Sequence, residues 1–166
     1  MTTVAQTAGF TGGFVDTGAV AGTTSTFTTT AAAAGLINGK FVTALGISTN
    51  LATPTTDATT GKAFVGLTPN QTCAIVFGQN AAGSLRMCQG PAISTEVGVT
   101  TTVGAFINAP QFPGLAEDFM PIAYTIVRTA PSAATFTPGT SSWTASGVSA
   151  TTFKRIGQLP DRPQIA

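Results

Sequence analysis

Apolar and β-branched residues occur along this chain in short runs, which Gly, Pro and Asn interrupt roughly every 8–12 residues. The clearest run is IAYTIVRTA at residues 122–130. Strict alternation there places Ile122, Tyr124 and Ile126 on one face of a strand, because successive side chains of a strand point to opposite sides. A helical period of 3.6 residues is absent from the N-terminal region. The pattern therefore predicts a chain of short β-strands.

Two hairpins are predicted from turn chemistry. Asn38-Gly39 separates two apolar-containing runs, and Asn-Gly favours a type I′ turn because both central residues need a positive φ. Farther along, the run TCAIVFG at 72–78 is followed by QNAAG and then by SLRMCQG at 84–90. This succession predicts two paired strands joined by a turn.

Other segments complete a count of about eight short strands. KAFVGL at 62–67, the β-branched stretch 93–107 and ATTFKRIGQ at 150–158 are further strand candidates, whereas 48–61 is a polar connection. Residues 108–121 contain three prolines and predict an ordered loop rather than a helix. The expected fold is all-β, a sandwich or jelly-roll-like domain.

The two ends of the chain differ in composition from its middle, which predicts three regions. Residues 1–25 are rich in Gly, Thr and Ala and are expected to form an extended N-terminal arm that docks through its few large apolar residues. Residues 26–158 form the β domain. Residues 159–166, with two prolines, are expected to form an extended C-terminal tail.

Composition adds a functional hint, because only 8% of the 166 residues are charged while 43% are hydrophobic. A soluble domain usually carries about 25% charged residues. The surface must therefore consist largely of hydroxyl, amide and methyl groups, which are cheap to desolvate. This composition favours a protein whose exterior becomes an interface, since interface cores are depleted of charge. A secreted or crowded-lattice protein with a neutral exterior is the alternative.

Several function classes are not expected. The net charge is +1 without a basic run, so binding to nucleic acid is not expected. There is no stretch of 18 consecutive apolar residues, and no signal peptide or membrane association is expected. The chain contains no His, the commonest general base, and only six carboxylates. We therefore expect no catalytic site, no metal and no cofactor; adjacent Glu117 and Asp118 are more typical of a solvated pair than of a catalytic dyad.

The two cysteines fall in the two arms of the second predicted hairpin. A turn centred between Asn80 and Ala81 would place Cys73 opposite Cys88. A cross-strand disulfide is then one interpretation, and two separate buried thiols are the other, favoured one.

A series of motifs resembles a known group of proteins. The motifs are NGK at 38–40, ATPTTDATTG at 52–61, AAGSLRMCQG at 81–90, FINAPQFP at 106–113, FMPIAYTIV at 119–127 and LPDRPQIA at 159–166. In this order they resemble small virion structural proteins of tailed bacteriophages, over residues 36–166. The resemblance implies a non-enzymatic capsid decoration or cement protein. Such a protein would assemble in the host cytoplasm, reside on the capsid surface, and bind the major capsid protein and itself as a homo-oligomer, for example a trimer.

Four aromatic residues are candidate interface anchors: Phe10, Phe14, Phe112 and Trp143. Ordinary core packing is the alternative for each, and it is at least as good an interpretation for Phe112 and Trp143. A phage tail-fibre, spike or receptor-binding module is the alternative function, and it would need exposed Trp or Tyr platforms for sugars. A cell-wall hydrolase, dependent on Glu96 or Glu117, is the third.

Overall fold

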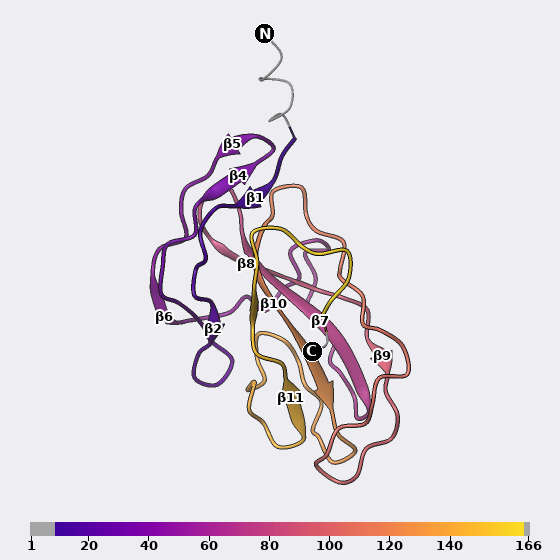
Figure 1. The fold of residues 1–166 in the computed structure, drawn as a ribbon. Helices are drawn as coiled ribbons and strands as arrows, with labels where there is room; N and C mark the ends of the chain where they lie inside the picture. Colours follow the sequence, from indigo (N-terminus) through magenta and orange to yellow (C-terminus); the bar gives the residue numbers. More distant parts are fainter. Residues whose placement is uncertain (1–8, 165–166) are drawn as a thin grey trace.

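The computed structural model describes residues 9–164, and within them the fold is all-β, as predicted, with no helix. The described residues form twelve strands in three antiparallel sheets, where the sequence predicted about eight strands in a single sandwich or jelly roll. Figure 1 shows how these strands are arranged. The strands are β1 (Gly12–Gly13), β2 (Val20–Ala21), β3 (Phe27–Thr29), β4 (Gly35–Ile37), β5 (Lys40–Phe41), β6 (Ser48–Leu51), β7 (Gln71–Gln79), β8 (Leu85–Gln89), β9 (Ile93–Ser94), β10 (Met120–Thr129), β11 (Val148–Ala150) and β12 (Lys154–Arg155).

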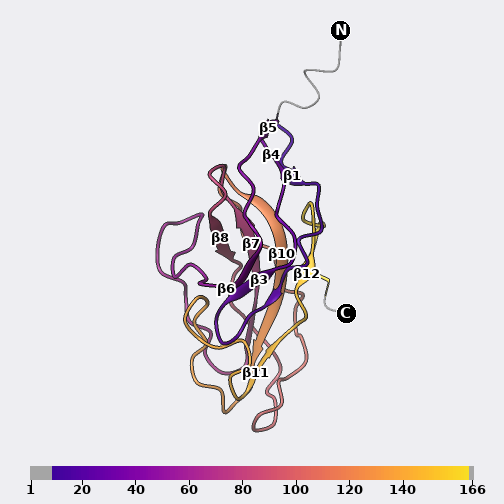
Figure 2. The same ribbon diagram turned by 90° about the vertical axis from the view of Figure 1, so that its left-hand side faces the viewer.

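The central sheet is built on its two longest strands, β7 and β10, which run antiparallel at the middle of the molecule (Figure 2). The order is β11-β10-β7-β8, with β12 also pairing β10 and β9 also pairing β7. The alternating run predicted at 122–130 is β10, with Tyr124 opposite Val76 in β7. The register shifts between Pro121 and Ala123, where the proline has no N–H to donate to the ladder.

Both faces of the central sheet are buried, and each has its own hydrophobic core. On one face Cys73, Ile75 and Phe77 of β7 pack with residues from the N-terminal segments. The β2–β3–β6 sheet covers this face, and Phe27 of β3 stacks on Phe77 at 4.9 Å between ring centroids. On the other face the side chain of Val76 packs with that of Tyr124. Strand β7 is therefore buried from Thr72 to Gln79, and its interior residues 73–77 are all apolar because neither face of the strand meets water.

Segments without regular structure cover the second face. The proline-containing segment 108–121 is a loop up to the start of β10, as predicted, and Phe112 contacts the Tyr124 ring edge-on at 4.9 Å. The C-terminal tail also lies on this face, since the N–H of Gln164 donates to the Tyr124 hydroxyl at 3.0 Å. Residues 161–162 of the tail form a bend, and Pro163 directly after it is buried.

The expected separate arm over residues 1–25 is wrong for the described part of it, residues 9–25. Strand β1 pairs with β4, and β2 pairs with β3. Thr17 and Ala19, between these strands, are buried. Residues 1–8 lie outside the described part of the chain. The boundary drawn at residue 25 thus falls inside a packed β-structure, because small residues allow these backbones to approach closely.

The first predicted hairpin is confirmed. Ile37 of β4 pairs with Lys40 of β5, and the two turn residues Asn38 and Gly39 have φ values of 50° and 76°. Both values lie in the left-handed region that a type I′ turn requires.

Three segments differ from the prediction. Residues 62–67 form only isolated bridges, because the side-chain amide of Gln89 bonds to both the N–H and the carbonyl of Val65, at 2.9 and 2.7 Å, in place of a strand. Within 93–107 only β9 is regular, and the rest folds back on itself. The polar connection 48–61 begins with β6, which pairs with β3.

Candidate interaction surfaces

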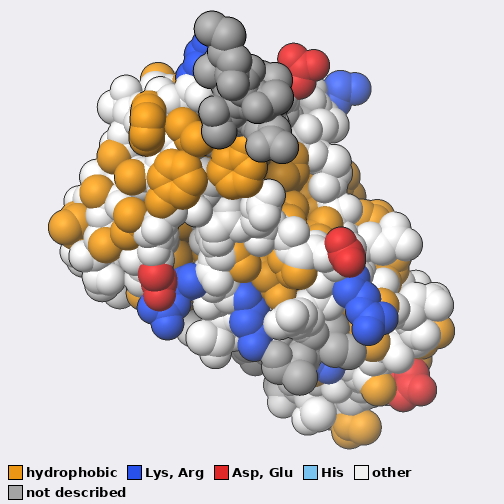
Figure 3. Space-filling model, turned by 45° about the horizontal axis from the view of Figure 1, so that its top comes forward, with side chains coloured by type: hydrophobic (Ala, Val, Ile, Leu, Met, Phe, Trp, Pro, Cys, Tyr) orange, Lys and Arg blue, Asp and Glu red, His pale blue; other side chains and the backbone are white. Residues whose placement is uncertain are grey.

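Three phenylalanines at one end of the molecule form what we call the aromatic patch: Phe10, Phe14 and Phe41. Their side chains are 37%, 57% and 85% exposed. The rings of Phe10 and Phe14 stack with 4° between planes, and Phe14 meets Phe41 edge-on at 6.4 Å between centroids. Figure 3 shows hydrophobic side chains gathered on the face at this end. The patch is therefore a candidate binding surface, since contiguous exposed apolar patches are often functional.

Backbone hydrogen bonds hold the aromatic patch in place. The N–H of Gly39 donates to the carbonyl of Phe10 at 2.8 Å, and the N–H of Phe14 donates to the carbonyl of Ala34 at 2.8 Å. The N–H of Gly13 donates to the carbonyl of Gly157 at 2.8 Å. The β4–β5 turn and the segment after β12 therefore position the rings, so binding a partner would cost little ordering entropy.

An ion pair lies beside the aromatic patch. Arg155 Nη1 is 3.3 Å from Asp16 Oδ2, and both side chains are about half exposed. Residues 13–16 and 155–157 line a hollow of about 220 Å³ that includes Phe14 and this ion pair. Exposed ion pairs contribute at most about 1 kcal/mol to stability. The pair therefore adds little to the stability of the fold, but it places one positive and one negative charge next to the aromatic patch.

A second apolar surface is formed by residues 95–107, which we call the valine loop. Val97, Val99 and Ile107 are 79%, 75% and 59% exposed. The loop is nevertheless a closed structure, because Val99 and Thr102 exchange backbone hydrogen bonds at 3.0 and 2.8 Å. The loop therefore presents methyl groups to solvent from a defined backbone.

Contacts with the body of the domain hold the valine loop. The N–H and hydroxyl of Ser132 both donate to the carbonyl of Thr100, at 3.1 and 2.8 Å. Arg128 Nη1 donates to the carbonyl of Gly104 at 3.2 Å, and its guanidinium lies 4.7 Å from the centroid of the Phe106 ring. A Cβ on Gly104 would lie 1.8 Å from the carbonyl oxygen of Glu96, so the close approach of the two loop strands requires glycine there.

The two surfaces lie at opposite ends of β10. Strands β1 and β4 lie next to the aromatic patch. Gly13 of β1 lies near Pro121, and Gly35 of β4 lies near Met120, both at the start of β10. Ser132, which holds the valine loop, follows its end at Thr129. A strand of 10 residues spans about 30 Å, so the two surfaces are well separated along the molecule.

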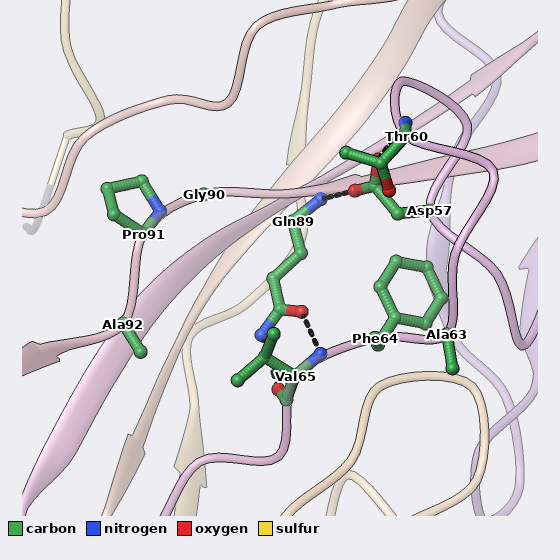
Figure 4. Close-up of a pocket in the computed structure, with 9 residues that line it drawn as sticks. All are labelled: Asp57, Thr60, Ala63, Phe64, Val65, Gln89, Gly90, Pro91 and Ala92. Carbon is green, nitrogen blue, oxygen red and sulfur yellow. Dashed lines mark hydrogen bonds between the residues drawn. The ribbon is translucent and has the colours of Figure 1, made fainter.

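A pocket near Asp57 is the best candidate for a small-molecule site, and Figure 4 shows its lining. Its volume is about 250 Å³, below the usual range of ligand sites. The Asp57 carboxylate accepts three backbone N–H bonds, from Thr59, Thr60 and Gln89, at 2.7–2.9 Å. These bonds fasten the 57–61 turn to β8, so the carboxylate has a structural role in this part of the fold.

The three carboxylates considered as candidate catalytic groups lie in solvent. Glu96, Glu117 and Asp118 are exposed, and the last two lie in the loop before β10. No three Asp, Glu or Cys side chains among residues 9–164 come together to hold a metal ion. The same part of the chain contains no helix long enough to cross a membrane.

The less favoured interpretation, in which Cys73 lies opposite Cys88, does not agree with the structure. Cys88 lies opposite Val76, and the two cysteines are free and buried in the cores on opposite faces of the sheet. The favoured interpretation, two separate buried thiols, agrees with the structure. Burial raises the pKa of Cys73 to about 12, and burial is also the main cause that raises the pKa of Cys88.

Of the four aromatic anchor candidates, Trp143 is buried and Phe112 is half-buried. Trp143 is 3% exposed and packs on Phe77, Phe136 and Phe153 with centroid distances of 5.6–5.8 Å. Phe112 is half-buried against Tyr124. Both therefore follow the core-packing alternative, while Phe10 and Phe14 are exposed and their role as anchors stays a prediction.

The sequence pattern did not predict which large apolar residues are the most exposed. Phe41 comes directly after the Asn38-Gly39 turn and Lys40, at a position where alternation alone does not distinguish core from surface. Val97 and Val99 flank Gly98 in a run that indicated a strand. The two closely spaced glycines, Gly98 and Gly104, were the available signal for a folded-back loop.

Comparison of the chain with protein-family models, with curated proteins and with solved structures gave no match.

Proposed function

We propose that this chain is a non-enzymatic structural protein of a tailed-phage particle, specifically a head decoration protein that binds the major capsid protein at the capsid surface and stabilises the shell. The observation that carries the proposal is the presence of two backbone-held apolar surfaces at opposite ends of a charge-poor domain. Exposed apolar area is costly for a free monomer and is expected where a partner covers it.

The layering of the domain is consistent with this role. The β2–β3–β6 sheet on the central sheet would be the sandwich-like body, and the aromatic patch and valine loop would be its contact points. Both surfaces are ordered before binding, which favours tight association because little conformational entropy remains to be lost.

The alternative of a sugar-binding tail module receives less support. The single Trp and the single Tyr, the residues expected to stack on sugars, are 3% and 1% exposed. Neither side chain is available to a glycan without disrupting the core.

Copy number in purified virions, measured by quantitative mass spectrometry against the major capsid protein, tests the proposal first. Hundreds of copies per particle are expected for a protein that covers the head. A dozen or fewer would move the chain to a tail or vertex, and its absence from virions would refute the virion assignment.

Binding of the purified chain to emptied capsid shells then tests the role of the valine loop. We expect Val97→Ser with Val99→Ser to weaken binding at least about tenfold, since each buried methyl group contributes about 0.8 kcal/mol. Val65→Ser is the control, because Val65 is 67% exposed and lies outside both surfaces. Equal loss of binding in the control would indicate a general effect of surface polarity and contradict a role for the loop.

A further inference from the structure

The aromatic patch is suited to a second copy of the same chain, and we propose that two copies associate through it about a twofold axis. This inference rests on the proposed function, because it names the partner of one of the two surfaces. The valine loop of each copy would then lie at the far end of the dimer, free for the shell.

The size of the patch fits the centre of an interface. An aromatic side chain can bury about 150–250 Å², so the exposed fractions of Phe10, Phe14 and Phe41 correspond to about 350 Å² of exposed ring surface. A stable interface buries about 800 Å² per partner, usually with an apolar centre and a polar rim. The patch supplies such a centre, and the hydroxyl-rich surface around it supplies a rim that is cheap to desolvate.

The charges beside the patch select a second copy as the partner. Asp16 and Arg155 lie side by side next to Phe14, and each keeps about half of its side chain in solvent. In a twofold interface the same patch meets itself in reverse. Asp16 of one copy can then face Arg155 of the other, twice, whereas a partner surface of a single sign would repel one of the two groups. Lys40, exposed beside Phe41, can remain solvated at the rim.

The aromatic rings add the second component of self-complementarity. Phe10 and Phe14 present a stacked pair, and Phe41 presents an edge to it. Aromatic rings attract one another in stacked and edge-to-face geometries. Two copies of the patch therefore offer each other favourable ring contacts, with the hollow beside Phe14 open to a side chain of the other copy.

Sedimentation equilibrium of the full chain over a wide concentration range tests the association. The expected species has twice the 16.6 kDa mass of one chain. Phe41→Ser should raise the dissociation constant at least tenfold. At concentrations where both proteins are monomeric it should leave the melting temperature unchanged, since the ring is 85% exposed. Val65→Ser should leave the dissociation constant unchanged.

A charge exchange tests the twofold geometry. Asp16→Arg alone and Arg155→Asp alone should each be monomeric, because every interface pair would then carry like charges. An equimolar mixture of the two variants should form a heterodimer by native mass spectrometry, in which both cross-interface pairs are opposite again. High salt should weaken that heterodimer.

The outcomes separate this inference from the proposed function. A chain that is monomeric at all concentrations, or that forms a trimer, overturns the twofold dimer, as does a mixture of charge variants that stays monomeric. If such a chain still binds shells through the valine loop, the proposed function stands alone. If the dimer forms but the chain is absent from virions and shells, the dimer stands and the proposed function fails.

Discussion

The indole Nε1 of Trp143 donates a hydrogen bond to the carbonyl oxygen of Thr26 at 3.1 Å, across 117 residues of sequence. The backbone N–H of Trp143 also donates to the carbonyl of Thr24 at 3.1 Å. The single tryptophan thus joins the C-terminal part of the chain to the strand that begins at Phe27. It lies among the aromatic rings that fill the core between the two layers, so its removal tests the packing of the whole domain.

Trp143→Ala is expected to lower the free energy of unfolding by about 3–5 kcal/mol, because it leaves a large cavity and an unpaired carbonyl. Urea unfolding followed by circular dichroism measures this loss. Phe41→Ala removes a comparable ring from an 85% exposed position and should change stability by less than about 0.5 kcal/mol. Similar losses in the two variants would contradict the assignment of Trp143 to the core.

Gln79 provides a second test, because its fully buried side-chain amide clamps a neighbouring segment. Its Oε1 accepts from the N–H of Leu45 at 2.7 Å, and its Nε2 donates to the carbonyl of Thr43 at 3.0 Å. Gln79→Met keeps the size but removes both bonds, so we expect a loss of about 2–3 kcal/mol. Hydrogen exchange at the Leu45 amide should accelerate accordingly.

Gln71→Met is the matched control for this clamp. Gln71 Oε1 accepts from the N–H of Thr68 at an exposed site, so water can replace that bond. A loss below about 1 kcal/mol is expected. If Gln79→Met were as mild as Gln71→Met, the buried amide would not be a structural clamp.

Local signals in the sequence were sufficient for the elements that depend on few residues. The turn at Asn38-Gly39 is encoded by two residues that tolerate positive φ, and β10 by strict alternation, so both were predicted. The second hairpin was also found, but its register was not. Asn80 Oδ1 accepts from the N–H groups of Ala82 and Ser84, which lengthens the turn and centres it on Ala82.

Contacts between distant segments could not be predicted in the same way. The position of Trp143 depends on Phe27, Phe77 and Phe153, which come from three separate parts of the chain. Equally, the exposure of Phe41 depends on the absence of a neighbouring strand beyond β5 among the described residues. The low charge content of the chain favoured an interface, but only the fold shows which large apolar side chains are exposed.

The raised pKa values of the two thiols predict a specific dependence of stability on pH. Burial holds Cys73 neutral up to a pKa of about 12, against 9.0 when unfolded. Above pH 9 the unfolded chain loses a proton that the folded chain keeps, so stability is full below pH 9 and falls toward pH 12. The expected slope is about 1.4 kcal/mol per pH unit for this thiol.

Comparison of wild type with Cys73→Ala isolates this effect, because other titrating groups are common to both proteins. The variant should be less stable at pH 7, and the difference between the two proteins should shrink between pH 9 and pH 11. Thiol labelling at pH 8 should be slow in the folded protein and fast in urea. A difference that stays constant with pH would show that Cys73 ionises equally in both states.

The Asn38-Gly39 turn supports the last prediction, which links backbone conformation to the aromatic patch. Gly39 has a φ of 76°, a conformation that costs an alanine about 1–2 kcal/mol. Gly39→Ala should therefore destabilise the β4–β5 hairpin, which carries Phe41 and whose turn bonds to Phe10. Gly46→Ala is the control, because its added Cβ meets no atom within 4 Å and its φ is not positive. That change should be neutral or stabilise by about 0.4–1 kcal/mol through the unfolded state. Urea unfolding measures the stability of the two variants. Equal effects would contradict the claim that the positive φ at this turn requires glycine.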